Sequence, residues 1–491
     1  GGGCVDSRPP PSQRTFASEL VEQEVEALAS NIHDATLACI FRNALPNCLD
    51  TTVYLFAPAN ASLAGAPASS SSCGRAAAAP EDDAFVVTGD IPAMWLRDST
   101  NQVLPYMRFA ARDGRLRAML GGLLRRQVRQ IRTDAYANAH SADALAGASP
   151  NAQDVTTKPS FMGTKVSAMS PTIFERKYEL DSLCAFLKLG AEYYAATGDA
   201  APFDSSWAQS VSIVLSTMRS QQKSTEEDEG IYSFQRCSSC SPRDTLEGGV
   251  GPPARRTGMV RSAFRPSDDA TTFQFLVPAN AMAVVELRRA ADVARRARGD
   301  HALGQELEDL AAEIEDGIRR EAVVVHRRTG EAVYAYEVDG FGNAFHMDDA
   351  NVPSLLSLPY LGFVPVNDTT YQSTRRIVLS AATNPFYFQG AAGQGVGSPH
   401  TGPGKIWPMS VIMQALTSQD DDEIRACLSV LRSTTASRWF MHESFDKDDA
   451  TAFTRPWFSW ANSLFGQLIF HLAESRPHLL LRPRAPPEAV V

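Results

Sequence analysis

Helical periodicity dominates this chain and predicts an all-α fold. Apolar residues recur three and four positions apart in one segment after another, the spacing of helices that bury one face. The clearest stripes are Leu120–Ile131, Leu183–Tyr194, Val211–Met218, Leu303–Ile318, Ile424–Leu431 and Trp460–Leu472. The segments 20–37, 279–298, 353–361 and 371–382 are also compatible with helices. About a dozen helices is the number that six inner helices ringed by six outer ones require. We therefore expect an (α/α)6 barrel with small β-hairpin insertions.

Turn and strand signals are few. Ala322–Val338 predicts a hairpin that turns at Thr329-Gly330. Val53–Phe56 and Phe85–Thr88 predict a second short pair. Pro456 suits the first turn of the last helix, where a backbone N–H donor is not needed.

No break in composition divides the chain, so we expect one catalytic domain over residues 31–475. Residues 1–30 would form an N-terminal extension, and residues 476–491 a disordered tail. Ala57–Asp83 is rich in Ala, Ser and Pro and predicts a surface insertion. Gln221–Asp269 is too long for an ordinary connection, which predicts a functional flap or an insertion.

Composition and charge exclude several classes of partner. Of the 491 residues, 44% are hydrophobic and 21% charged, as in soluble globular enzymes. A net charge of −10 disfavours nucleic acid and anionic membrane surfaces as partners. No apolar run reaches the roughly 18 residues that span a bilayer. We expect a monomer without direct membrane contact.

The cysteines and two glycosylation sequons predict an oxidising compartment. There are eight cysteines, an even number, and acceptor sequons at Asn60 and Asn367. The chain begins at Gly1 rather than Met, which suggests that an upstream signal or anchor has been removed. These features together predict the secretory lumen or secretion. Cys237 and Cys240 form an isolated CxxC that makes a poor zinc site, and the disulfide pairing is not deducible.

Gly89–Tyr106, GDIPAMWLRDSTNQVLPY, combines the residue types that bind sugars. An aromatic ring such as that of Trp95 can stack on the apolar face of a sugar. Asp90, Arg97 and Asp98 can form charge-assisted hydrogen bonds with its hydroxyls. The alternative is a helix start in which Arg97 and Asp98 form a structural ion pair.

Further motifs follow in order along the chain: FERKYELDSL at Phe174–Leu183, MDDANVPSLLSLPY at Met347–Tyr360, FMHESF at Phe440–Phe445 and FTRPWFSWANSLFG at Phe453–Gly466. With the first motif, they resemble the signature of glycoside hydrolase family 125, the exo-acting α-mannosidases. The resemblance runs from roughly Asn31 to Ala473, nearly the whole chain.

This resemblance implies an inverting exo-α-mannosidase that removes terminal α-1,6-linked mannose, with no metal and no other cofactor. The substrate would be a mannose-containing oligosaccharide or N-glycan. Glycoside hydrolysis requires two carboxyl groups at the scissile bond. The resemblance assigns Asp181 as the general acid and Glu443 as the general base.

The remaining candidate residues are expected to bind the sugar. Tyr178 precedes Asp181 by three residues and could orient it from the same helical face. Asp348 and Asp349 are also a plausible hard-cation pair, although we interpret them as sugar contacts. The full set of predicted binding residues is Asp90, Trp95, Arg97, Asp98, Tyr178, Asp348, Asp349, Asn351, His400, Trp407, His442, Trp460 and Asn462.

Two alternatives to this function are open. The same barrel could carry an α-glycosidase with a pocket shaped for glucose, or a mannose-binding protein without catalysis. A binding protein needs neither Asp181 nor Glu443, so their presence together favours an enzyme.

Overall fold

The structure is a computed structural model that describes residues 4–56, 83–142, 149–156, 169–228, 232–236, 238 and 241–483. The predicted insertion Ala57–Asp83, with its sequon at Asn60, therefore lies outside the described residues except for Asp83, which begins β2. Cys73, Cys237 and Cys240 also lie outside them.

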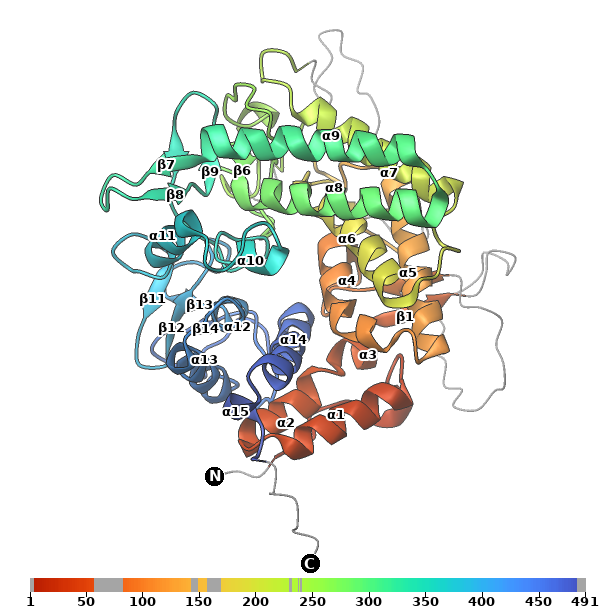
Figure 1. Cartoon of the computed structure of the whole chain (residues 1–491), viewed down its shortest axis with the longest axis vertical. Coiled ribbons are helices and arrows are strands. Elements are labelled where there is room, and N and C mark those ends of the chain that lie inside the picture. Colours follow the sequence, from red (N-terminus) through yellow and green to blue (C-terminus); the bar gives the residue numbers. More distant parts are fainter. Residues whose placement is uncertain are drawn as a thin grey trace, which may run out of the picture.

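A ring of inner helices forms the centre of the fold (Figure 1). It comprises α4 (Leu96–Val103), α6 (Leu180–Thr197), α8 (Val277–Arg298), α10 (Leu358–Leu361), α12 (Pro408–Leu416) and α14 (Ser459–Ser475). Helix α14 packs on α4, α4 on α6, α6 on α8 and α8 on α10, while α12 packs on α14 from the other side. This arrangement is the (α/α)6 barrel predicted from the sequence.

A second layer surrounds this ring. It consists of α2 (Ala35–Ala44), α5 (Gly114–Thr133), α7 (Ser205–Gln221), α9 (His301–Gly317), α11 (Thr369–Val378) and α13 (Asp421–Ser433), with α1 (Glu19–Asn31) against α2. Each of the six is capped by an aspartate whose side chain accepts a backbone N–H: Asp34, Asp113, Asp204, Asp300, Asp368 and Asp420. None of the six inner helices has such a side-chain cap among the described residues.

Short antiparallel sheets lead into the inner helices. The strands are β1 (Val53–Phe56) with β2 (Asp83–Val86), β3 (Met94–Trp95) with β4 (Ala139–His140) and β5 (Ile173–Glu175), β6 (Phe275–Leu276) with β9 (Glu337–Val338) and β10 (Ala344–Phe345), β7 (Val323–Val325) with β8 (Ala332–Tyr334), β11 (Tyr387–Gln389) with β12 (Gln394–Val396), and β13 (Lys405–Ile406) with β14 (Phe445–Asp446). Strands β3, β6 and β13 each end within one residue of an inner helix. The hairpin predicted over 322–338 is confirmed as β7–β8.

Two predicted helices differ from those observed. The segment 20–37 is divided into α1 and α2, because Asp34 caps the start of α2. The segment 353–361 is helical only over Leu358–Leu361, and the preceding chain is held by hydrogen bonds to Asp348.

The prediction that Pro456 lies in the first turn of the last helix is wrong. Pro456 precedes α14 by three residues. The chain is still extended at Phe458, whose N–H donates to the Met441 carbonyl at 2.8 Å.

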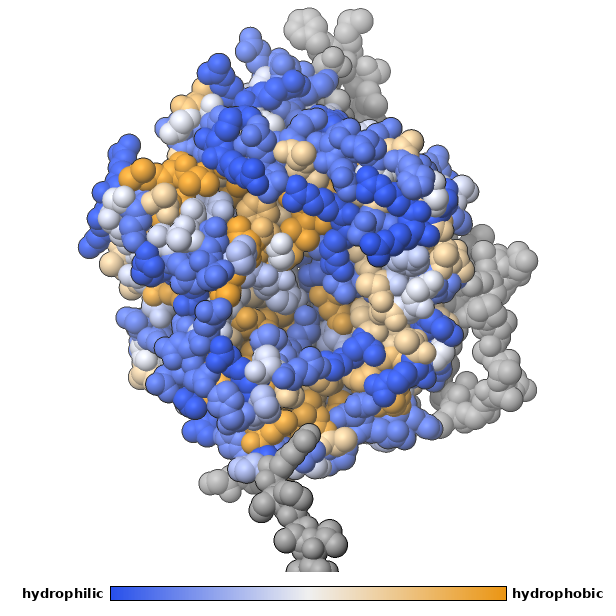
Figure 2. All heavy atoms as spheres, viewed as in Figure 1, coloured by the Kyte–Doolittle hydropathy of each residue, from blue (hydrophilic) through white to orange (hydrophobic). Residues whose placement is uncertain are grey.

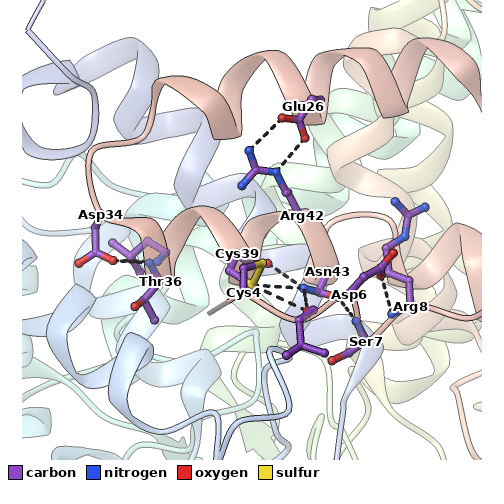
Figure 3. Close-up of a disulfide and its surroundings, with 12 residues drawn as sticks. Cys4, Asp6, Ser7, Arg8, Glu26, Asp34, Thr36, Cys39, Arg42 and Asn43 are labelled. Carbon is purple, nitrogen blue, oxygen red and sulfur yellow. Dashed lines mark hydrogen bonds and ion pairs between the residues drawn. A yellow bond between two sulfur atoms is a disulfide. The ribbon is translucent and has the colours of Figure 1, made fainter. Parts of the chain in front are cut away.

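The predicted N-terminal extension and part of the predicted tail belong to the barrel. A disulfide joins Cys4 to Cys39 of α2, and the nearby Ser7 N–H donates to Asn43 Oδ1 at 2.7 Å (Figure 3). At the other end, α15 (Pro477–Leu480) buries Leu480, whose carbonyl accepts the His33 N–H at 3.0 Å. The described segments near both ends of the chain therefore pack in or beside α2.

Hydrophilic side chains cover most of the face shown in Figure 2, and hydrophobic ones gather toward its middle and lower edge. Within the part of the chain that the structure describes, no helix combines the length and apolar character of a membrane span.

Candidate active site

A cavity of about 390 Å³ lies where inner helices begin. Aromatic rings and carboxylates line it together: Trp95, Trp407, Phe458, Trp460, Asp98, Asp268 and Glu443. Such a lining offers apolar faces for a sugar ring and charged partners for its hydroxyls.

The small sheets place the lining residues. Trp95 is the last residue of β3, and Arg97 lies in the first turn of α4. Strand β13 pairs with β14 through Ile406 and Phe445, which sets Trp407 close to the segment that carries Glu443. Residues distant in sequence thus reach one cavity from helix starts and strand ends.

One buried guanidinium, that of Arg97, faces four carboxyl groups. Its Nη1 lies 2.5 Å from Glu179 Oε2 and 3.3 Å from Asp181 Oδ2. Its Nη2 lies 3.2 Å from Asp268 Oδ1 and 3.4 Å from Asp98 Oδ2. The ion pair proposed as an alternative for Arg97 and Asp98 therefore exists, and both residues also line the cavity.

Because one cation faces four acids, several of these carboxyl groups hold their protons to a higher pH than they would in water. Burial raises the pKa of Asp98 and that of Asp181 to about 6, against the opposing effect of Arg97. Burial also raises the pKa of Glu179 well above its usual range. For Asp268, burial is outweighed by Arg97 and by a hydrogen bond with Glu179, and its pKa is lowered. Glu179 and Asp268 therefore share a proton.

Asp268 belongs to this cluster and reaches the cavity, whereas Asp181 does not. The Asp181 side chain is 0% exposed, contacts Arg97 and does not line the cavity, while that of Asp268 is 26% exposed. Asp268 has a left-handed backbone, with φ of 67°, and Lys177 Nζ donates to its carbonyl at 2.8 Å. Non-glycine residues seldom adopt this conformation, which Asp tolerates better than most.

The sequence prediction missed Asp268. It lies at the end of the 221–269 segment, which was interpreted only as a flap or an insertion. The signal was Arg265-Pro-Ser-Asp-Asp269, in which two adjacent acids follow an arginine by three and four residues.

Glu443 lines the same cavity, and its side chain is 9% exposed. Arg455 Nε lies 3.5 Å from Glu443 Oε1, and its Nη1 lies 3.6 Å from Asp90. Arg455 was also missed, although it lies within a quoted motif. Asp90 itself is exposed and does not line the cavity.

Of the other predicted site residues, those that line the cavity are Trp95, Arg97, Asp98, Asn351, His400, Trp407 and Trp460. His400 Nδ1 lies 3.3 Å from Asp269 Oδ1. Burial opposes the charge on His400, but this hydrogen bond, together with the negative charges of Asp269, Asp268 and Glu443, outweighs burial and raises the His400 pKa. The acids of the cavity therefore favour the protonated form of His400.

The remaining predicted residues do not line the cavity. Tyr178 is buried and packs edge-on against Tyr136 and Tyr232, which stack on each other. His442 stacks on Phe453, and its Nδ1 contacts the Arg455 carbonyl at 2.7 Å.

Asn462 also acts on the backbone beside Glu443. Its Oδ1 accepts the Met441 N–H at 2.8 Å, and its Nδ2 donates to Asn47 Oδ1 at 3.0 Å. Asn462 is buried and does not line the cavity.

Asp348 and Asp349 use their oxygens to hold the backbone. Asp348 accepts the N–H groups of Leu355 and Leu356 at 2.8 and 2.9 Å. Asp349 accepts from Asn351 and from Ser398 Oγ at 2.9 Å, which orients the cavity residue Asn351. Across the described residues, no group of three or more His, Cys, Asp or Glu side chains is placed to hold a metal ion.

A helical toroid whose cavity combines tryptophans, an arginine and several carboxylates has the architecture of a glycoside hydrolase. The model of the GH125 family, metal-independent α-mannosidases, matches residues 34–470. The chain therefore belongs to the GH125 family of metal-independent α-mannosidases.

Two relatives resemble the chain over most of its length. The meiotically up-regulated gene 157 protein of Schizosaccharomyces pombe is 41% identical over 482 residues, which cover 96% of this chain and 89% of that protein. A metal-independent α-mannosidase of Streptococcus pneumoniae, solved in a non-productive complex with α-1,6-mannobiose, is 35% identical with a TM-score of 0.82. That match covers 94% of this chain and all of the bacterial one (100%).

Proposed function

We propose that this α-mannosidase removes terminal non-reducing α-1,6-linked mannose from glycans by an inverting, exo-acting mechanism. The observation that carries the proposal is the small cavity in which Asp268 and Glu443 lie among tryptophans. The α-1,6 linkage rests on likeness to the Streptococcus pneumoniae relative, which was solved with that mannobiose.

In this proposal Asp268, rather than Asp181, donates the proton to the leaving oxygen. An acid must lie within hydrogen-bonding reach of the atom it protonates, and Asp181 is fully buried and does not line the cavity. As the bond between the anomeric carbon and the glycosidic oxygen breaks, the proton passes from Asp268 to that oxygen.

Glu443 is the general base in the same reaction. It removes a proton from the water that attacks the anomeric carbon, while Arg455 stays close to its carboxylate. Arg97, Asn351 and His400 provide hydrogen-bonding groups for the sugar, and the tryptophans provide apolar faces.

A panel of linkage-defined α-mannobioses tests the linkage. We expect mannose release from the α-1,6 isomer and little from the others. Proton NMR early in the reaction should show β-mannose, since inversion changes the anomeric configuration. Initial release of α-mannose would overturn the inverting mechanism. Faster release from an α-1,2 or α-1,3 isomer would overturn the linkage preference.

A comparison of Asp268→Asn with Asp181→Asn tests the acid. On α-1,6-mannobiose we expect Asp268→Asn to lose about two to four orders of magnitude in turnover. The same variant should keep most activity on α-mannosyl fluoride, whose leaving group needs no proton. Equal losses on both substrates for Asp268→Asn would exclude Asp268 as the acid. A selective loss on the mannobiose that occurs only in Asp181→Asn would return the acid role to Asp181.

We also propose that the protein works in an oxidising lumen or outside the cell. The Cys4–Cys39 disulfide and the exposed sequon at Asn367 support this location. Peptide N-glycosidase should lower the mass of the protein isolated from its natural source. An unchanged mass together with free Cys4 and Cys39 thiols would contradict the proposal.

A further inference from the structure

Asp268 lies in a tight turn over residues 265–269, which we call the Asp268 turn. Phe264 and Ala270 pair in an antiparallel bridge on either side of it. Within the turn, the Arg265 N–H donates to the Asp269 carbonyl and the Asp268 N–H donates to the Arg265 carbonyl, each at 2.8 Å. The left-handed backbone of Asp268, with φ of 67°, costs free energy, so it persists only where surrounding contacts hold it.

A buried carboxylate on a neighbouring strand, that of Glu337, contacts the chain on both sides of Asp268. Glu337 belongs to β9, and its side chain is 0% exposed. Its Oε1 accepts from Arg265 Nε at 2.6 Å. Its Oε2 accepts the backbone N–H groups of Thr272 and Phe273, each at 2.9 Å. The two oxygens of one side chain therefore clamp the turn at its start and just after its end.

The Arg265 side chain completes this clamp. It is 5% exposed, its Nη2 donates to Thr272 Oγ1 at 3.2 Å, and its guanidinium lies 5.4 Å from the centre of the Tyr336 ring. A planar guanidinium holds several acceptors in fixed relative positions, which a lysine ammonium does not. Neither Glu337 nor Arg265 lines the cavity. An effect of this ion pair on the reaction must therefore pass through the chain that carries Asp268.

The clamp is attached to a rigid part of the barrel. Glu337 pairs with Leu276 of β6, and α8 begins at the next residue. The Asp268 turn, by contrast, is irregular chain. A loop residue is placed more precisely when it is held by groups on helices and strands.

We propose that Glu337 is a positioning residue for the reaction: by holding Arg265 and the chain after the turn, it fixes the Asp268 carboxyl group at the cavity. The inference rests on the proposed acid role of Asp268. An acid must lie within hydrogen-bonding reach of the oxygen it protonates. Because a misplacement of about 1 Å can cost about a hundredfold in rate, loss of the clamp should slow the step that uses Asp268.

The test is the turnover of Glu337→Gln on two substrates. Glutamine keeps the length of the side chain and one acceptor oxygen, but it has no charge to pair with Arg265. We expect kcat on α-1,6-mannobiose to fall about tenfold to a hundredfold. On α-mannosyl fluoride, whose leaving group needs no proton, kcat should stay close to that of the unmodified enzyme. A contact with a structural role alone would change both substrates alike.

Substitutions of Arg265 test the same clamp from its other side. Arg265→Met should show the same selective loss on the mannobiose, and Arg265→Lys, which keeps the charge but not the planar set of donors, a smaller one. Adding Arg265→Met to Glu337→Gln should lower kcat little further, since both changes remove one interaction. Fully additive losses would show that the two residues act separately and would overturn the proposal.

Glu423→Gln is the matched control. Glu423, on α13, also clamps an arginine and a second donor: it accepts from Arg375 Nη2 at 2.9 Å and from Gln414 Nε2 at 2.7 Å. Neither Glu423 nor Arg375 lines the cavity, so we expect this variant to treat the two substrates alike. Equal losses on both substrates in Glu337→Gln, no loss on either, or the same selective loss in Glu423→Gln would overturn the proposal.

If Glu337→Gln does not fold, the double variant Arg265→Met with Glu337→Leu makes the same comparison. It removes both charges and therefore leaves no buried charge without a partner. We expect the same selective loss on the mannobiose, and equal losses on both substrates would overturn the role. Failure of the underlying acid assignment is seen separately, as equal losses of Asp268→Asn on mannobiose and fluoride.

Discussion

Replacing Arg97 by methionine should destabilise the fold in a pH-dependent way. The Arg97 side chain is 4% exposed and contacts four carboxyl groups, so its removal leaves buried acids without their cation. Breaking a buried ion pair from one side costs about 3–5 kcal/mol. We expect a loss of this size in the free energy of unfolding near neutral pH.

The loss should shrink as the pH falls. Burial already raises the pKa of Asp98 and Asp181 to about 6, above the value of roughly 4 expected in the unfolded chain. Groups whose pKa is raised on folding favour the folded state below their unfolded pKa and lose that contribution as the pH rises through their folded pKa. Without Arg97 these folded pKa values rise further, so the two proteins should differ least near pH 4–5 and most above pH 7.

Urea denaturation at pH 5 and pH 8 measures both quantities. Arg42→Met is a suitable control, because Arg42 pairs with Glu26 at the surface and exposed pairs contribute at most about 1 kcal/mol. A loss for Arg97→Met that matches the control, or one that is equal at both pH values, would refute the reasoning.

Three further predictions concern the base, the disulfide and metal. Glu443→Gln should lower turnover by about two to four orders of magnitude while calorimetry still detects binding of mannobiose; turnover within tenfold of the unmodified enzyme would exclude Glu443 as the base. The Cys4–Cys39 disulfide joins residues 35 apart in sequence, and chain entropy gives such a loop about 4 kcal/mol. The double Ser variant should therefore melt at lower temperature but keep its kcat at 25 °C, and an unchanged Tm would refute this. Exhaustive chelation should leave activity unchanged, since Asp348 and Asp349 bind backbone and side-chain donors; a loss restored by calcium would contradict it.

Regular helices were predictable from the sequence because their apolar stripes are local. Val211–Met218 lies on α7, and Leu303–Ile318 lies on α9 and the π-helical turn that follows it. The stripe alone defines which face is buried, so no long-range information was needed.

The cavity was less predictable because long-range contacts build it. Asp268 lies in irregular chain, and its position depends on contacts such as Lys177 to its carbonyl and the Phe264 N–H to the Tyr178 carbonyl at 3.0 Å. No spacing in the sequence encodes those contacts. Neighbours also diverge: Glu443 lines the cavity, while His442 packs against Phe453.

The contrast between capped outer helices and uncapped inner helices has a consequence for engineering. An N-cap contributes about 1 kcal/mol to a helix, and the outer layer has this contribution at all six positions. The residues at the same N-cap position of the inner helices are Trp95, Glu179, Leu276, Ser357, Trp407 and Phe458. Four of these six residues line the cavity or touch its acids. A capping aspartate at the start of α4, α12 or α14 would replace an aromatic side chain that lines the cavity and would exchange activity for stability. Substitutions that raise thermal stability would therefore have to be sought elsewhere in the molecule.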